Sequence, residues 1–83
     1  MLRKGMIWMP MDKKDQLAEL ISNAETSFYN GQLQEAFSLS LSAIKLDENC
    51  ADAYQYAANV CMSLSRYEDA IEYYQKVQIY IML

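Results

Sequence analysis

Residues 51–80, ADAYQYAANVCMSLSRYEDAIEYYQKVQIY, decide the fold of this chain. Apolar and small residues recur in this stretch with the period of an amphipathic α-helix. They are Ala53, Tyr54, Ala57, Ala58, Cys61 and Met62 in the first half, and Tyr67, Ala70, Ile71, Tyr74 and Val77 in the second. Between the halves, Ser65 and Glu68 have the spacing of a helix capping box, so a second helix is expected to begin at about Arg66. The stretch predicts two antiparallel helices joined by a tight turn.

The same stretch resembles a tetratricopeptide repeat, a unit of about 34 residues that forms two antiparallel helices. The residues that carry the resemblance are Tyr54, Ala57, Ala58 and Cys61 in the first helix, and Tyr67, Ala70, Tyr74 and Val77 in the second. Residues 67–76, YEDAIEYYQK, are close to the consensus of that family.

A shift of one repeat length toward the N-terminus aligns an earlier copy of this pattern. Leu20 overlays Tyr54, Ala24 overlays Ala58, Leu33 overlays Tyr67, Ala36 overlays Ala70, and Ala43 overlays Val77. Asn30 and Gly31 supply the turn, because both tolerate a positive φ. We therefore expect one repeat over residues 17–50 and a second over residues 51–83.

The first of these repeats departs from the family pattern at three positions. Ser27 and Ser40 stand where aromatic residues are common, and Glu48 stands where a proline is usual. Because serine fills less space than an aromatic ring, we expect the core of the first repeat to be weaker than that of the second.

The patterns predict an all-α chain of about four helices, an α-solenoid of antiparallel helix-turn-helix repeats over residues 12–83. The first helix follows Asp12, a candidate N-cap, and the third follows a candidate cap at Asn49. For residues 77–83, VQIYIML, a short β-strand is the alternative to continued helix. Helix is favoured because no breaker interrupts the pattern after Tyr67. Residues 1–11 are expected to be an N-terminal arm or a tag-like segment.

Charge is distributed unevenly over the 83 residues, whose net charge is −4. Residues 1–14 hold four basic residues and one acid, whereas the rest holds three basic residues and ten acids. An acidic body repels phosphate backbones, so no nucleic-acid partner is expected. No stretch approaches the roughly 18 apolar residues of a membrane span, so no membrane partner is expected.

The residue types exclude most catalytic chemistry. There is no histidine, which excludes histidine-ligated metal sites and histidine acid–base catalysis. Of the two cysteines, Cys61 lies on the apolar stripe and is expected to be buried, whereas Cys50 is expected to be an exposed thiol. Adjacent acids such as Glu68 and Asp69 point away from each other on a helix. We therefore expect no enzymatic activity, no cofactor and no metal, and a reducing, cytoplasmic location.

The resemblance implies a concave groove, lined mainly by the first helix of each repeat, that binds a peptide or helix of a partner protein. The groove residues that it implies are Ile21, Glu25, Phe28, Tyr29, Asp52, Gln55, Asn59 and Met62. One subclass of the family holds the C-terminal carboxylate of heat-shock chaperones with lysine and asparagine. Ile21, Glu25 and Tyr56 stand at those positions here, so that carboxylate clamp is not expected. The expected function is a non-catalytic protein–protein interaction module.

Self-assembly is the alternative function. Two repeats are fewer than the three or so that a stable array usually needs. A terminal repeat is usually covered by a helix with a polar outer face, whereas residues 77–83 hold one polar residue, Gln78. We therefore expect a homo-oligomer, a dimer or larger scaffold. Its self-association surface is expected to comprise Tyr73, Val77, Tyr80, Ile81 and Leu83. A small secretion-type chaperone and a fragment of a longer array are further alternatives.

Overall fold

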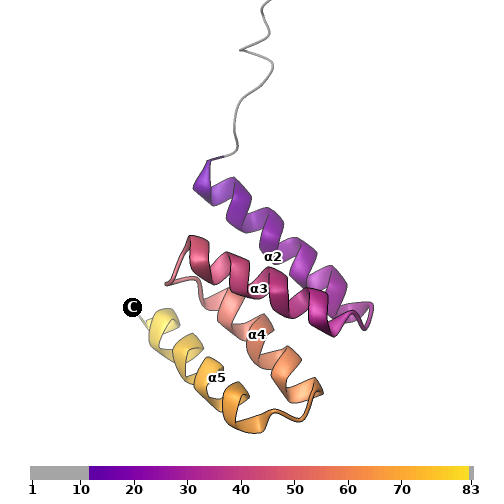
Figure 1. The fold of residues 1–83 in the computed structure, drawn as a ribbon. Helices are drawn as coiled ribbons and strands as arrows, with labels where there is room; N and C mark the ends of the chain where they lie inside the picture. Colours follow the sequence, from indigo (N-terminus) through magenta and orange to yellow (C-terminus); the bar gives the residue numbers. More distant parts are fainter. Residues whose placement is uncertain (1–11, 83) are drawn as a thin grey trace, which may run out of the picture.

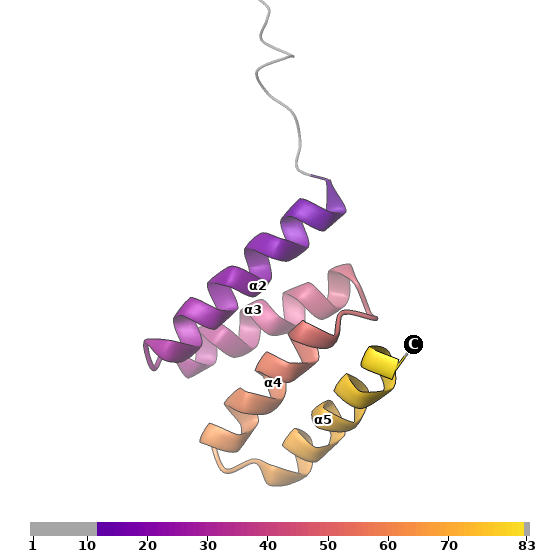
Figure 2. The ribbon, with the colours of Figure 1, turned by 180° about the vertical axis from the view of Figure 1, so that it is seen from behind.

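The structure is a computed structural model that describes residues 12–82. This range holds four α-helices and no strand: α2 (Lys13–Tyr29), α3 (Leu33–Leu46), α4 (Ala51–Ser63) and α5 (Tyr67–Met82). The helices pack in chain order, with α2 and α5 at the two ends of the stack (Figure 1). The α2–α3 and α4–α5 turns lie on one side and the α3–α4 loop on the other, as Figure 2 shows from behind. The predicted all-α fold of antiparallel helix-turn-helix units is confirmed.

Of the two N-caps predicted at Asp12 and Asn49, the structure confirms the first and not the second. The Asp12 carboxylate accepts from the Asp15 backbone amide over 2.9 Å, which confirms the predicted cap of α2. The predicted cap of α4 at Asn49 is wrong, because Cys50 occupies the cap position without a side-chain hydrogen bond. Asn49 instead donates its backbone amide to the Asp47 carboxylate over 3.0 Å and belongs to the preceding turn.

The turn within each helix pair has the same backbone hydrogen bonds. Two amides reach back to carbonyls of the preceding helix, which is the Schellman arrangement of a helix C-terminus. The bonds run from Gly31 to Phe28 and from Gln32 to Ser27 in the first turn, and from Ser65 to Met62 and from Arg66 to Cys61 in the second, over 3.1, 2.8, 3.1 and 2.8 Å. Gly31 and Ser65 have positive φ angles of 80° and 62°. The two turns are thus equivalent and lie one repeat length apart in the sequence.

The predicted capping box between Ser65 and Glu68 is wrong. Ser65 has the left-handed conformation that ends α4, and the residue directly before α5 is Arg66. Arg66 forms an ion pair with Asp69 over 3.0 Å, one turn into α5. The helix nevertheless restarts next to the expected place, at Tyr67.

Small side chains form most of the buried core. The buried residues are Ala24, Ser27, Ala36, Ser40, Ala43, Ala53, Tyr54, Ala57, Ala58, Val60, Cys61 and Ala70. Methyl side chains let helix backbones approach closely. Ser40 is fully buried, and its hydroxyl donates to the Ala36 carbonyl over 2.8 Å. The predicted burial of Cys61 is confirmed, whereas Cys50, expected to be exposed, is half-buried.

Tyr54 joins α4 to α5 and to the α3–α4 loop. Its hydroxyl donates to the Glu48 carbonyl over 2.8 Å, and its ring stacks on that of Tyr80 with centroids 5.4 Å apart. The Tyr73 ring lies 6.3 Å from Tyr54 and meets Phe37 of α3 edge-on. α5 is helical through Met82, so the strand alternative is wrong for residues 77–82.

Candidate partner-binding groove

A cleft of about 400 Å³ lies between the exposed face of α2 and the start of α4. Its lining residues are Lys14, Leu17, Ala18, Ile21, Ser22, Glu25, Cys50 and Asp52. The residues of α2 recur at steps of three and four, so the helix places them on one face. The α3–α4 loop then brings Cys50 and Asp52 beside that face.

The cleft combines an apolar floor with acidic walls. Leu17 and Ile21 are half-buried and supply the apolar surface, whereas Glu25 and Asp52 are exposed carboxylates. Lys14 is the one cation among the lining residues. Such a site can accept an apolar side chain and attract cationic groups next to it.

Three of the eight predicted groove residues, Ile21, Glu25 and Asp52, line this cleft. Phe28 and Tyr29 lie at the C-terminal end of α2, outside the cleft, with their ring centroids 5.4 Å apart in an edge-on contact. The Tyr29 side chain is 73% exposed.

The other three predicted groove residues are on α4 and do not line the cleft. Gln55 and Met62 are exposed, and Asn59 is half-buried. The side-chain carbonyl of Asn59 accepts a hydrogen bond from the Tyr74 hydroxyl of α5. Asn59 therefore ties α4 to α5, and its carbonyl already has a partner within the chain.

Tyr56 is a residue that sequence reasoning did not assign to the groove. Burial is the main cause that raises the pKa of Tyr56, followed by the nearby Glu25 carboxylate. Tyr56 of α4 therefore lies near Glu25 of α2, which lines the cleft.

Some of the cleft residues that were not predicted could have been found from the sequence, and others could not. Leu17 and Lys14 precede Ile21 by four and seven positions, so the helical period alone indicates that they share its face. Cys50 has no such signal, because its place at the cleft depends on the path of the α3–α4 loop.

The predicted self-association residues fall on two sides of α5. Tyr73, Val77 and Tyr80 are half-buried, and the two tyrosine rings face Tyr54 of α4. Ile81 is 68% exposed. Leu83, like the arm expected over residues 1–11, lies outside the described residues.

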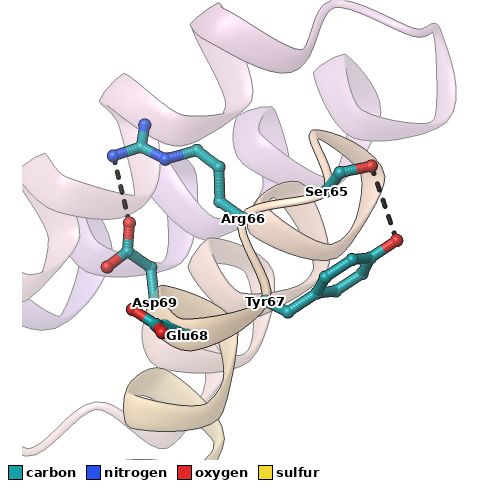
Figure 3. Close-up of a pocket in the computed structure, with 5 residues that line it drawn as sticks. All are labelled: Ser65, Arg66, Tyr67, Glu68 and Asp69. Carbon is teal, nitrogen blue, oxygen red and sulfur yellow. Dashed lines mark hydrogen bonds and ion pairs between the residues drawn. The ribbon is translucent and has the colours of Figure 1, made fainter.

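A second hollow, of about 350 Å³, lies at the α4–α5 turn and is lined by residues 65–69. Figure 3 shows the Arg66 guanidinium reaching to the Asp69 carboxylate, and the Tyr67 hydroxyl turned toward Ser65. The ion pair spans 3.0 Å and the hydroxyl contact 3.4 Å. These polar groups satisfy each other, so the hollow presents few free partners to a ligand.

The two thiols are poorly suited to nucleophilic chemistry. Burial is the main cause that raises the pKa of both Cys50 and Cys61, and nearby carboxylates, including those of Asp52 and Asp69 respectively, add to the effect. A raised pKa leaves less of the reactive thiolate at neutral pH. Within residues 12–82, no three acidic or cysteine side chains lie close enough together to hold a metal ion.

Comparison of the chain with protein-family models, curated proteins and solved structures finds no match. The described helices also include none that is long and apolar enough to cross a membrane. The tetratricopeptide resemblance therefore depends on the chain's own residues and on the repeat-length spacing of its turns.

Proposed function

We propose that the chain is a tetratricopeptide-type interaction module that binds an extended segment of a partner protein along α2. The observation that carries this proposal is the cleft itself, in which Leu17 and Ile21 form an apolar floor beside Glu25 and Asp52. The repeated turns of the two helix pairs support the repeat class.

The chemistry of the cleft favours a ligand with an apolar anchor flanked by basic residues. Burying a leucine-sized side chain on Leu17 and Ile21 contributes about 1.5–3 kcal/mol. An exposed ion pair to Glu25 or Asp52 adds only about 0.2–1 kcal/mol. The apolar anchor thus supplies most of the affinity, and the carboxylates select cationic over anionic neighbours. The same acidic charge disfavours nucleic acid as the partner.

A non-catalytic role fits the side chains of the site. The half-buried thiol of Cys50, which lines the cleft, is mostly protonated at neutral pH because burial raises its pKa. The Glu25 carboxylate lies near the Tyr56 phenol. Neither group is arranged to activate the other as a nucleophile and base.

Two fluorescent peptides of about 12 residues test the proposal, because extended ligands of this length can span such a groove. One peptide carries a central leucine with two lysines on each side, and the other replaces the lysines by glutamates. Fluorescence anisotropy with the full chain is expected to show about tenfold tighter binding of the lysine peptide at low salt. Ile21→Asn is expected to weaken that binding by roughly tenfold or more.

Asp52→Lys and Glu35→Lys form a matched pair, since each removes an acid from the first turn of a helix and only Asp52 lines the cleft. We expect Asp52→Lys to reduce the preference for the lysine peptide and Glu35→Lys to leave it unchanged. Equal binding of the two peptides to the unmodified chain, or equal effects of the two variants, contradicts the proposal.

A further inference from the structure

The outer face of α5 carries a mostly apolar stripe that the other described helices leave largely exposed. Its members are Tyr67, Ile71, Tyr74, Gln78 and Ile81. They alternate at steps of four and three, which is the period of a coiled-coil seam. The apolar members are 55%, 55%, 39% and 68% exposed in that order. Tyr74 keeps its orientation through its hydrogen bond to Asn59.

The first helix pair shows what such a stripe does when it is covered. The equivalent positions in α3, one repeat earlier, are Leu33, Phe37, Ser40 and Ile44, followed by Asp47 in the loop. The four helical residues are buried or half-buried in the stack, where α4 packs against α3. The stripe on α5 is therefore a helix-packing surface by its position in the repeat.

The opposite end of the stack does not complement this stripe. Ala53, Ala57 and Val60 form a fully buried row on α4. The equivalent row on α2 consists of Glu19, Asn23 and Thr26, which are polar and exposed. Because α2 offers no apolar row to the α5 of another copy, head-to-tail stacking into an open array is disfavoured. Among the described residues, the stripe on α5 of a second copy is an apolar row of the same length and period.

The charges on α5 favour an antiparallel arrangement of two such helices. Glu68, Asp69 and Glu72 lie in the first half of the helix, and residues 77–82 carry no charge. An antiparallel pair places the acids of one helix beside the uncharged half of the other, whereas a parallel pair places the acids together. The dipoles of two neighbouring helices also attract each other only when the helices are antiparallel.

We propose that two copies of this chain form an isologous dimer through antiparallel pairing of their α5 stripes. Tyr74 lies near the two-fold axis. Tyr67 faces Ile81 of the partner subunit, and Ile71 faces Gln78 of the partner subunit. The single polar position at Gln78 fixes the register, as a lone polar residue does in a coiled-coil seam. This pairing is independent of the groove on α2, so either proposal can fail without the other.

The test is the solution mass of the full chain by light scattering, over dilutions from about 1 mM to about 1 µM. We expect a dimer that dissociates on dilution. Ile71→Glu and Ile79→Glu give a matched pair, because both side chains are 55% exposed on α5 and only Ile71 belongs to the stripe. Ile71→Glu is expected to raise the dissociation constant by on the order of 100-fold, and Ile79→Glu to leave it nearly unchanged.

Circular dichroism checks that each variant keeps its helix content. If Ile71→Glu fails to fold, Ile81→Lys, near the end of the helix, takes its place. A chain that is monomeric at every concentration overturns the proposal and leaves the stripe to another protein. A dimer that Ile71→Glu and Ile79→Glu weaken equally also overturns it.

Charge pairs then distinguish the two orientations. Tyr67→Glu and Ile81→Lys are each expected to weaken the dimer when introduced alone. Combined in one chain, they restore it if the helices are antiparallel, because each new carboxylate then faces a new ammonium group of the partner. Parallel helices place like charges together, so a double variant that stays monomeric overturns the antiparallel pairing.

Discussion

Gly31 and Ser65 hold the same left-handed backbone conformation at equivalent positions of the two turns. Glycine adopts this conformation freely, whereas a side chain adds a steric cost of roughly 1–2 kcal/mol. Ser65 bears that cost, and Gly31 does not. The second turn is therefore the more strained of the two.

Replacing Ser65 by glycine is expected to stabilise the fold. The relief of backbone strain exceeds the added entropy of the unfolded chain, which leaves a net gain of about 0.5–1 kcal/mol in the free energy of unfolding. Urea denaturation measures the change. Gly31→Ala is the converse variant, and a new Cβ at that position meets no atom within 4 Å. Its expected loss of about 1 kcal/mol is thus a backbone effect alone, and a neutral result at both positions contradicts this account.

Tyr54→Phe tests the bond between α4 and the α3–α4 loop. The variant keeps the ring that stacks on Tyr80 and removes the hydroxyl that donates to the Glu48 carbonyl. We expect a loss of about 1 kcal/mol in the free energy of unfolding. Hydrogen exchange of the loop amides, residues 47–50, should quicken while α2 keeps its protection. Uniform quickening over all four helices would show that the bond does not act locally.

An aromatic residue at position 40, as is common in the family that the chain resembles, should destabilise this fold. The Ser40 side chain is fully buried, and its hydroxyl bonds to the Ala36 carbonyl within the same helix. Ser40→Ala removes only this local bond, so we expect a change within about 0.5 kcal/mol. Ser40→Tyr forces α3 and α4 apart and is expected to cost about 3 kcal/mol or more. Thermal unfolding of both variants measures the difference, and an equally stable tyrosine variant would refute the close packing.

Alkaline pH should destabilise the fold. Burial raises the pKa of the thiols of Cys50 and Cys61 and of the phenols of Tyr54, Tyr56 and Tyr73 above their ordinary values of 9.0 and 10.0. The folded state thus holds these protons more tightly than the unfolded state does. The resulting stability is fully present below about pH 9 and is lost as the pH rises through the folded pKa values.

The urea midpoint is accordingly expected to be constant between about pH 7 and pH 8 and to fall above about pH 9. Tyr73→Phe is the control, because it removes one of the phenols with a raised pKa and should make the decline above about pH 10 shallower. A urea midpoint that rises through this range would show that the folded state holds these protons less tightly than the unfolded state.

Regular helical patterns made most of the fold predictable from the sequence. Helical periodicity is a local property of the sequence. It predicted the apolar rows of α2 and α3 and the continuous helix of α5 after Tyr67. The predicted N-caps at Asn49 and Ser65 were wrong, because whether a residue caps a helix depends on the backbone angles around it. A serine three residues before a glutamate fits a capping box, but the Schellman turn had already placed Ser65 in a left-handed conformation.

The groove was predictable in part. The family resemblance implied Ile21 and Glu25 on one face of α2 and Asp52 at the start of α4, and these three line the cleft. Asn59 was predicted to line the groove, but its side-chain carbonyl accepts a hydrogen bond from Tyr74, 15 positions away in the sequence. Contacts of this kind depend on how helices pack, which local periodicity does not encode.

The packing of helices in chain order has a consequence for biosynthesis. The α2–α3 pair closes through its own turn and needs no residue beyond Leu46 for its mutual contacts. Closing such a short loop costs little entropy, so contacts of this kind form early and fast. We expect the first pair to begin forming while α5 is still being translated. The order in which the ribosome delivers the helices is then also the order in which each one finds its neighbour.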